Sequence, residues 1–468
     1  MNLIKDIEHY DFLNTASKIA GEVGVELYIV GGFVRDIFLK RQKDEIDFLI
    51  VGKENNFVER FSKELDVKKI NIYKNFGTAQ FMFNDLKLEF VNSRKESYNK
   101  ESRNPKVING TFEEDIARRD FTINTLAVSL NQNNFGELID TYNGLQDIEN
   151  KIIKTPLNPD ETFDDDPLRI MRAFRFAATL DFDVDEKIIE AARLNKERLK
   201  IVSQERITDE FLKILSSSKP SIGLKLLQKS EVMSVVFPQI SKLEGVEQRK
   251  DFHHKEVFLH TCTVVDNISE NTEDVWLRFA ALVHDIAKPQ TKKFVEGTGW
   301  TFHGHEEIGA RMMNQIFHNL KLPLSKLNYI KKLVRLHLRP IALAKDEVTD
   351  SAIRRFIVEA DEDLNDLITL CRADITSKNP QKVSKYLANY DRVMKKVLEV
   401  QEKDKLRAFQ SPVRGEEIMK VCNLKPSKKV GEIKKVIEEA ILDGIIANDY
   451  DEAYDYLLKI KDKFLENT

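Results

Sequence analysis

Hydrophobic positions follow two different periods along the chain, and the change comes near residue 160. Before it, segments rich in β-branched and aromatic residues are bounded by turn-forming residues, which predicts strands at residues 25–32, 45–51, 76–83 and 86–92. The last two are expected to pair across a turn at Asn84 and Asp85. Residues 11–24 have the period of an amphipathic helix, so this part of the chain predicts a mixed α/β head.

Beyond residue 160, apolar positions recur every three to four residues in one segment after another, and strand patterns almost vanish. The predicted fold class is therefore α+β, with a small head built on a mixed sheet and a long helical remainder. Two stretches lack a clear period. Residues 93–115 are polar and predict a mobile loop, and residues 240–255 predict a junction between domains.

The chain has 468 residues, of which 42% are hydrophobic and 32% are charged, with a net charge of −4. This length exceeds a single hydrophobic core and indicates roughly two to four domains. Because the net charge is negative, a nucleic-acid partner would have to be held by a local basic patch. Composition alone leaves a small-molecule enzyme equally open.

The three cysteines stand far apart, without the spacing of a zinc site or a disulfide framework, which is typical of a reducing compartment. The N-terminal residues are charged where a signal peptide needs an apolar run, and no stretch approaches ~20 consecutive apolar residues. We therefore expect a soluble, cytoplasmic protein with no membrane partner. Nothing in the pattern predicts an oligomer.

The strand at 45–51 carries two carboxylates, Glu45 and Asp47, on one face, because side chains alternate along a strand. Two such groups are costly side by side without a cation, and their oxygen ligands suit Mg²⁺. Gly31 and Gly32 follow an earlier strand, where bare backbone lets a phosphate approach. Glu89 is a candidate third carboxylate, and a surface position is its equal alternative.

The segment GGFVRD at 31–36, followed by EIDFLIV at 45–51, resembles the signature of the polymerase-β-like nucleotidyltransferase superfamily. That family has aspartate at both carboxylate positions, whereas this chain has Glu45 at the first. Later segments are similar, in order, to further signatures of bacterial CCA-adding enzymes and their poly(A) polymerase relatives: RRDFTINTLA (118–127), DTYNGLQDIENKII (140–153), DDPLR (165–169) and QERITDEFLKIL (204–215).

The resemblance implies an enzyme that transfers nucleotides from CTP and ATP to the 3′ end of transfer RNA. It implies that Glu45 and Asp47 hold catalytic Mg²⁺, with Glu89 as the candidate third catalytic residue. The residues implied to bind the nucleotide are Gly31, Gly32, Arg35, Arg118, Arg119, Asp120, Asn124, Asp166, Arg169 and Arg172. The adjacent arginines offer donor forks to a triphosphate, and the neighbouring aspartate and asparagine contact the ribose or orient those arginines.

Asp166 and Arg169 lie three residues apart, so on a helix they would share one face. A carboxylate beside a guanidinium can bond the Watson–Crick edges of cytosine and adenine. The resemblance implies that this pair replaces a nucleic-acid template. An ordinary surface ion pair is the alternative.

Most of the nine histidines lie between residues 253 and 337. Imidazole and carboxylate ligands suit Mn, Fe, Co, Ni or Mg. The order of histidines and aspartates along this region, H…HD…H…H…D, resembles that of the HD phosphohydrolase superfamily. This resemblance implies the metal ligands His260, His284, Asp285, His305, His337 and Asp374. It implies an accessory phosphatase or 2′,3′-cyclic phosphodiesterase activity, with Lys288 as a candidate phosphate contact.

These patterns predict four parts: a nucleotidyltransferase head at 1–150, a helical neck and body at 151–250, an HD domain at 251–390 and a helical tail at 391–468. Two alternatives stay open. An enzyme of the same fold could add only A, only CC or poly(A). Alternatively, Glu45 could disable the head and leave a phosphohydrolase or an RNA-binding protein.

Overall fold

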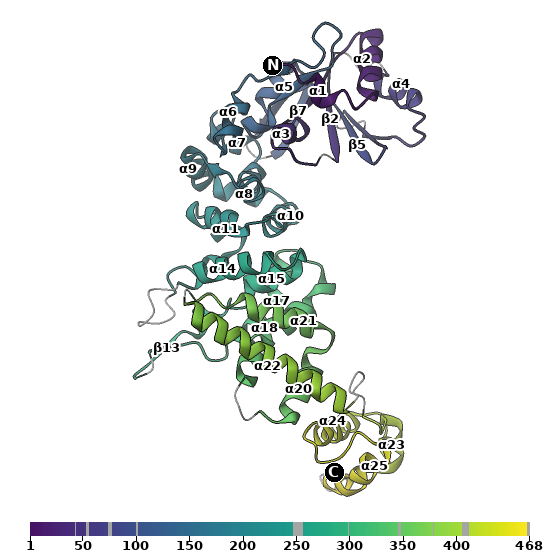
Figure 1. Ribbon diagram of the computed structural model, residues 1–468, viewed down its shortest axis with the longest axis vertical. Helices are drawn as coiled ribbons and strands as arrows, with labels where there is room; N and C mark the ends of the chain where they lie inside the picture. The colour runs from purple at the N-terminus through teal and green to yellow at the C-terminus, as the bar shows by residue number, and fades with distance from the viewer. Residues whose placement is uncertain are drawn as a thin grey trace. The chain divides into compact units, whose positions relative to one another are not determined.

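The computed structural model describes residues 1–42, 44–52, 56–73, 77–99, 102–246, 256–297, 299–344, 348–377, 379–404 and 411–465. The chain forms two compact units, Met1–Lys242 and Leu243–Thr468, which Figure 1 colours from purple to yellow along the chain. Strands concentrate in the first part of the first unit, and helices dominate elsewhere among the described residues. The predicted α+β class is confirmed.

The first unit begins with a seven-stranded sheet in the order β3-β4-β5-β2-β1-β8-β9. Its strands are β1 Glu26–Val30, β2 Glu45–Val51, β3 Asn71–Tyr73, β4 Thr78–Phe83, β5 Leu86–Asn92, β8 Ala127–Ser129 and β9 Leu138–Ile139. β2 and β5 run parallel, whereas the other neighbouring pairs run antiparallel. The sheet is mixed, as predicted. Asn84 and Asp85 form the tight turn between β4 and β5, with φ of 47° and 64°.

Helices cover both faces of this sheet. On one face, the rings of Phe48 and Phe90 stack with centroids 4.8 Å apart and meet Phe61. On the other, Tyr28 packs against Phe112 at 4.4 Å. The helices of the head are α1 Ile4–Ile7, α2 Phe12–Val23, α3 Gly32–Phe38, α4 Phe57–Glu64, α5 Phe112–Ala117 and α6 Gly144–Glu149, with a 3₁₀ turn, η2, at Thr122–Asn124.

Residues 93–115 do not form the irregular loop that their composition predicts. They contain an antiparallel pair, β6 Arg94–Asn99 and β7 Ser102–Asn109, followed by the start of α5. Thr111 caps α5 in a capping box with Glu114. The prediction was wrong because backbone hydrogen bonds hold a strand pair, and a polar sequence without an alternating apolar pattern can form them.

The rest of the first unit is helical, as predicted, apart from the short parallel strands β10 Ile152–Ile153 and β11 Asp183–Val184. Its helices are α7 Pro159–Asp165, α8 Leu168–Leu180, α9 Glu186–Asn195, η3 Lys196–Ile201, α10 Gln204–Leu215, α11 Pro220–Lys229, α12 Met233–Val236 and α13 Pro238–Ser241. α8 packs against both α10 and α11. Gly223 permits this approach, since a Cβ there would lie 2.6 Å from Ile214 Cγ2.

The second unit is helical except for one hairpin, β12 Lys293–Val295 and β13 Gly299–Thr301, which the hydrophobic pattern did not predict. Its first helices are α14 Val257–Ser269, α15 Val275–Val283, α16 Lys288–Thr291, α17 His305–Asn319, η4 Leu324–Lys326, α18 Leu327–Leu336, α19 Arg339–Leu343, α20 Asp350–Ala360, η5 Asp361–Asp363 and α21 Leu364–Ala373. The long helix α22 Pro380–Asp404 packs along α20 (Figure 1).

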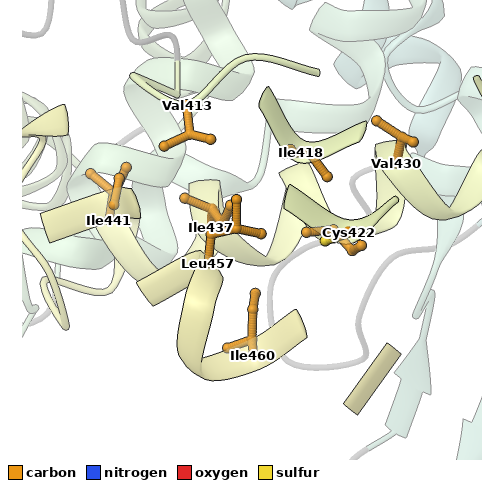
Figure 2. Packing of buried hydrophobic residues seen from close by; sticks show 10 residues of the cluster. Val413, Ile418, Cys422, Val430, Ile437, Ile441, Leu457 and Ile460 are labelled. Carbon is orange, nitrogen blue, oxygen red and sulfur yellow. The ribbon is translucent and has the colours of Figure 1, made fainter. Parts of the chain in front are cut away.

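Three helices, α23 Gly415–Cys422, α24 Lys428–Leu442 and α25 Tyr450–Leu465, end the described chain. Figure 2 shows their shared core, in which Ile437 and Ile441 of α24 meet Leu457 and Ile460 of α25. Cys422 of α23 lies in the same core as a free thiol. Across the described residues, no helix combines the length and the apolar character that a membrane span would need.

Candidate functional site

The first candidate site is a group of carboxylates on the parallel strands β2 and β5. Asp47 pairs in register with Glu89, and Glu45 pairs with Lys87. Strand alternation puts all four side chains on the face that also carries Tyr28. Oxygen atoms of Glu45, Asp47 and Glu89 all lie within 4.8 Å of one another. This donor set, three hard oxygen ligands from two rigid strands, fits Mg²⁺.

Lys87 holds two of these carboxylates and was not singled out from the sequence. Its Nζ lies 2.5 Å from Glu45 Oε1 and 2.9 Å from Glu89 Oε2. Partial burial lowers the pKa of Lys87, but the hydrogen bonds that it donates to both glutamates raise this pKa above the ordinary value. The signal was present in the sequence, because Lys87 and Glu89 are two residues apart on one strand and must share a face.

Asp47 is partly buried, as is Glu89, whereas Glu45 is exposed. Burial, and then the charge of Glu45, raises the pKa of Asp47 to about 6, while Arg119 acts to lower it. Such a shift indicates negative charge confined where water screens it poorly, which a divalent cation would relieve.

Gly31 lies in the turn between β1 and α3, beside the carboxylate of Asp47. It has φ 77° and ψ −135°, a conformation that suits glycine. A Cβ at this position would lie 3.1 Å from Arg119 Nη1 and 3.4 Å from Asp47 Oδ2. The glycine therefore keeps the space beside both groups open. Gly32 is less constrained, since a Cβ there would meet Arg35 Nη2 at 3.5 Å.

Asp115, on α5, anchors the two adjacent arginines and was missed from the sequence. Its fully buried carboxylate lies 2.6 Å from Arg118 Nη2 and 3.4 Å from Arg119 Nη2. Nε of Arg119 is buried and has no hydrogen-bond partner among the described residues. A buried donor without a hydrogen-bond partner costs about 1–3 kcal/mol, and a bound anion could accept the missing hydrogen bond. The spacings i,i+3 and i,i+4 could have identified Asp115.

A second network lies between the head and α8. Asp120 accepts hydrogen bonds from Arg172 Nε at 2.8 Å, from Arg172 Nη2 at 2.6 Å and from Asn124 Nδ2 at 3.0 Å. Asn124 Oδ1 in turn accepts from Arg35 Nη1 at 2.8 Å. Burial would raise the pKa of Asp120, but Arg172 and Asn124 lower it to about 2. The side chains of Asp120 and Asn124 therefore orient Arg172 and Arg35, and the backbone carbonyl of Asn124 accepts a hydrogen bond from Arg119 Nη1 at 3.4 Å.

Phe176, on α8, gathers three guanidinium groups. Its ring centroid lies 4.2 Å from Arg175, 5.3 Å from Arg35 and 5.5 Å from Arg172. Glu210 of α10 accepts from Arg175 Nε at 2.6 Å. The sequence named Arg35 and Arg172 as nucleotide-binding residues, but the aromatic residue that collects them became visible only in the structure.

Asp166 and Arg169 do not share a helical face. Asp166 stands between α7 and α8 in extended backbone, with φ −138° and ψ 99°, and its Oδ1 accepts from the amide of Leu168. Arg169 lies inside α8, is buried, and donates to the carbonyls of Arg118 and Thr162. Spacing alone misled here, because Pro167 interrupts the helix and fixes the preceding residue in an extended conformation. The two residues are nevertheless close, because the amide of Arg169 donates to the carbonyl of Asp166 at 3.0 Å.

The second candidate site joins five helix ends in the second unit. His260 lies in α14, His284 ends α15, and Asp285 follows it directly. His305 begins α17, His337 ends α18 and Asp374 ends α21. The four histidines and Asp285 are buried. The structure thus brings together all six residues named from the sequence, although they span more than one hundred positions.

Each histidine ring is fixed through Nδ1. Nδ1 of His284, His305 and His337 lies 2.7 Å from the carbonyl oxygens of Ala281, Phe302 and Val334 respectively. Nδ1 of His260 lies 2.9 Å from the hydroxyl of Thr376.

A carbonyl can only accept, so Nδ1 carries a proton in these three rings, and in the neutral imidazole the lone pair is then on Nε2. That is the tautomer a metal ligand needs.

The two carboxylate oxygens of Asp285 face different histidines of the cluster. Its Oδ2 lies 3.1 Å from His284 Nε2 and 3.6 Å from His260 Nε2, whereas its Oδ1 lies 3.2 Å from His305 Nε2. Asp374 Oδ1 approaches His260 Nε2 at 2.9 Å. His284 Nε2 is buried yet lacks a hydrogen bond of acceptable geometry. These residues fit one or two divalent cations bridged by Asp285.

The charges of this cluster are strongly coupled. Burial lowers the pKa of His284, but Asp285 and Asp374 raise it to about 10. Burial, together with the charge of His284, lowers the pKa of His337 to about 4. Lys288 Nζ lies 2.6 Å from Asp285 Oδ2. His303 and His318 are exposed outside the cluster, and His253 and His254 lie outside the described residues.

Comparison with known families matches three models to consecutive parts of the chain. Residues 27–154 match the poly A polymerase head domain, and residues 181–243 match the probable RNA- and SrmB-binding site of polymerase A. Residues 253–379 match the HD domain. The first match contains the carboxylates of β2 and β5, and the last contains the histidine cluster.

Characterised relatives cover most of the chain. An A-adding tRNA nucleotidyltransferase of Deinococcus radiodurans is 31% identical over 338 residues, covering 70% of this chain and 75% of that protein. A multifunctional CCA protein of Tolumonas auensis is 29% identical over 75% of this chain and 84% of its own length. A CC-adding tRNA nucleotidyltransferase of Thermus thermophilus is 26% identical over 92% of this chain and 93% of its own length.

Solved structures share the fold. A CCA-adding enzyme in an apo form superposes with a TM-score of 0.66 at 20% identity, covering 98% of this chain and 99% of that one. The Thermotoga maritima CCA-adding enzyme complexed with tRNA superposes with a TM-score of 0.60 at 20% identity, covering 97% and 95%. From the matched models, the relatives and this fold together, the chain belongs to the CCA-adding tRNA nucleotidyltransferase and poly(A) polymerase family and carries an HD domain.

Proposed function

We propose that this enzyme adds CCA to the 3′ end of transfer RNA, with CTP and ATP as nucleotide donors. The observation that supports it best is the group of Glu45, Asp47 and Glu89. Gly31 brings the guanidinium of Arg119 against Asp47 in the same group. Ligands for a divalent cation and donors for a triphosphate are thus next to each other, as phosphoryl-transfer chemistry requires.

In the proposed reaction, the 3′-oxygen of the RNA forms a bond to the α-phosphorus of the nucleotide. The bond from that phosphorus to the β-phosphate oxygen breaks, pyrophosphate leaves, and the hydroxyl proton passes to solvent. Mg²⁺ bound by Glu45, Asp47 and Glu89 would lower the pKa of the attacking hydroxyl and offset the developing negative charge. Arg119 and Arg118, braced by Asp115, would orient the triphosphate.

Asp166 and Arg169 are proposed to select the base. The guanidinium of Arg169 is held by the carbonyls of Arg118 and Thr162, so its orientation is linked to the residues proposed to bind the triphosphate. Asp166 uses one oxygen to cap Leu168, which leaves the other as an acceptor for an exocyclic amine. A carboxylate acceptor beside guanidinium donors matches the edges of both cytosine and adenine.

The test is incubation of the enzyme with a transfer RNA lacking CCA, Mg²⁺ and labelled CTP, ATP or both, followed by sequencing of the products. Addition of CCA would support the full activity. The characterised relatives include A-adding and CC-adding enzymes, so AMP alone, CMP alone or a run of AMP would instead assign a narrower member of the family. Absence of incorporation from either nucleotide would sink the proposal.

A substitution separates the metal site from general damage. Asp47→Asn keeps the shape of the side chain but removes its charge, so nucleotide addition is expected to fall at least ~100-fold while tRNA binding persists. Asp44→Asn is the matched control, because Asp44 is exposed just before β2. Equal activity of the Asp47→Asn enzyme and its parent would show that the metal assignment is wrong.

A second activity, hydrolysis of phosphate esters, is proposed for the histidine cluster. The supporting observation is that three rings are fixed by carbonyls with Nε2 directed at Asp285. In the proposed step, a water oxygen bonds to phosphorus, the bond to a ribose oxygen breaks, and that oxygen takes a proton. Mn, Fe, Co, Ni or Mg bound there would supply an activated water.

His284→Ala combined with Asp285→Ala should abolish hydrolysis of 2′,3′-cyclic phosphates and leave CCA addition intact. His318→Ala, an exposed histidine of α17, is the matched control. The metal that restores activity to chelator-treated enzyme identifies the cofactor. Hydrolysis that survives in the double variant would assign the activity elsewhere.

A further inference from the structure

The hairpin β12–β13 is inserted in the chain between two members of the histidine cluster, Asp285 and His305. Both of its ends are tied to that cluster. Before the hairpin, Lys288 Nζ lies 2.6 Å from Asp285 Oδ2. After it, the carbonyl of Phe302 accepts a hydrogen bond from His305 Nδ1 at 2.7 Å. The hairpin therefore leaves the chain and rejoins it at residues in contact with the cluster.

The hairpin displays aromatic rings that the fold does not bury. Phe294 and Trp300 are register partners on the two strands, so they share one face, and their ring centroids lie 5.2 Å apart at 75°. Phe294 is 53% exposed. A ligand that covers this exposed ring would gain the free energy of removing its apolar surface from water.

Lysines surround these rings. Lys292 Nζ lies 4.4 Å from the Trp300 centroid, and Lys288 Nζ lies 5.6 Å from the ring of Phe302. Lys293 is exposed at the start of β12. Between Asp285 and His305 the chain holds three lysines but one acidic residue, Glu296, although the whole chain carries a net charge of −4. The hairpin is thus a local positive, aromatic surface.

We propose that this hairpin is a nucleotide-binding platform for the histidine cluster. The base of a nucleotide stacks on the exposed ring of Phe294 and meets Trp300, which stands at 75° to that ring, while Lys292 and Lys293 meet its phosphate or that of the next residue. A free nucleotide and the 3′-terminal nucleotide of a single-stranded RNA share this chemistry. The inference rests on the proposed hydrolytic site, whose phosphate substrate the platform would select.

The competing explanation is that Phe294 and Trp300 only stabilise the hairpin as a cross-strand pair. A binding measurement separates the two without requiring hydrolysis. The chain has two tryptophans, so a Trp276→Phe enzyme leaves Trp300 as the single reporter. Its fluorescence is expected to be quenched saturably by 2′,3′-cyclic AMP, and by a short RNA ending in a 2′,3′-cyclic phosphate.

In that background Phe294→Ala should weaken binding about five- to one-hundredfold, the effect of losing one stacked ring. Tyr386→Ala, an exposed aromatic of α22 in the same unit, should leave binding unchanged. Tighter binding of the RNA than of the free nucleotide would assign the RNA end as the source. Absence of quenching by either ligand, or unchanged affinity in Phe294→Ala, would overturn the platform.

Hydrolysis gives a second, independent comparison. Trp300→Ala should lower kcat/KM for 2′,3′-cyclic AMP but not for ribose 2′,3′-cyclic phosphate, which has no base to stack. An equal loss for both would indicate a collapsed hairpin and contradict the platform, and Trp300→Phe should retain the discrimination. If the unsubstituted enzyme hydrolyses neither compound with any divalent metal, the proposed hydrolase fails, and the fluorescence measurement still decides the platform.

Discussion

At the scale of single residues, both candidate metal sites have a lysine in contact with their carboxylates. Lys87 lies between Glu45 and Glu89, and Lys288 touches Asp285. An ammonium group offsets negative charge that would otherwise repel, but it must give up its place when a divalent cation binds. We therefore expect each lysine to make metal binding at its site weaker and more readily reversed.

Removal of Lys87 gives the first prediction. Lys87→Met should tighten binding of Mn²⁺ to the head about fivefold, because an exposed ion pair of this kind is worth about 1 kcal/mol. The measurement is a titration followed by electron paramagnetic resonance of free Mn²⁺, in an enzyme whose histidine cluster carries His284→Ala. Lys63→Met, on the exposed surface of α4, controls for the lost charge. Weaker binding in Lys87→Met would mean that the lysine organises the carboxylates instead of competing with the cation.

Asp120 gives a prediction about pH. Its pKa in the folded chain is lowered to about 2 from 3.8. Its contribution to stability is therefore complete above pH 4 and is lost as the pH falls toward 2. Asp120→Asn should cost about 2 kcal/mol of unfolding free energy at pH 7. Chemical unfolding between pH 7 and pH 2.5 measures the unfolding free energy of the variant and of its parent. The difference between the two free energies should become smaller as the pH falls. A difference that does not change with pH would contradict the assignment to the Asp120 carboxylate.

At the scale of secondary structure elements, the proposed nucleotide site depends on the position of α8 relative to the head. α8 carries Arg169, Arg172 and Phe176, and its position is set by close packing against α10 and α11. Gly223 is the point of closest approach, because a Cβ there would also lie 3.2 Å from the carbonyl oxygen of Phe174. A change at this contact should reach the arginines through the helix.

Gly223→Ala is therefore expected to destabilise the first unit by about 1–3 kcal/mol through overpacking. The same substitution at Gly431, in α24, meets open space and should stabilise the second unit by up to about 1 kcal/mol, as alanine normally does in a helix. Thermal unfolding of the two variants provides the comparison. If Gly223→Ala stabilised the first unit as Gly431→Ala is expected to stabilise the second, the side chains packed around Gly223 would have to be able to move aside.

At the scale of the whole molecule, two compact units hold the two candidate metal sites, one in each. A ligand that binds one folded unit should stabilise that unit by mass action and leave the other unaffected, provided that they unfold separately. We expect two transitions in calorimetry of the metal-free enzyme. Mn²⁺ is expected to bind both sites, so its addition should raise both transitions, that of the second unit by several degrees. His284→Ala should remove only the rise of the second-unit transition. One transition that shifts as a whole would show that the units unfold together.

The sequence by itself determined the fold class, the family and four strands of the seven-stranded sheet, whereas β3, β8 and β9 were not predicted. β2 and β5 were predicted with their observed bounds because apolar alternation and turn residues act locally. The six residues of the histidine cluster were also named in advance, since their order along the chain is itself a signature. Local patterns failed at residues 93–115 and at the β12–β13 hairpin, where backbone pairing forms strands without an alternating apolar sequence.

Tertiary structure alone decided which groups share a site. Lys87 reaches Glu45 only because β2 and β5 pair in one particular register, and Arg35 meets Arg172 only through Asn124, Asp120 and Phe176. Pro167 separates Asp166 from the helix of Arg169, against the spacing argument. Periodicity fixes which face a side chain takes, but contacts between distant segments depend on register and packing, which no local pattern encodes.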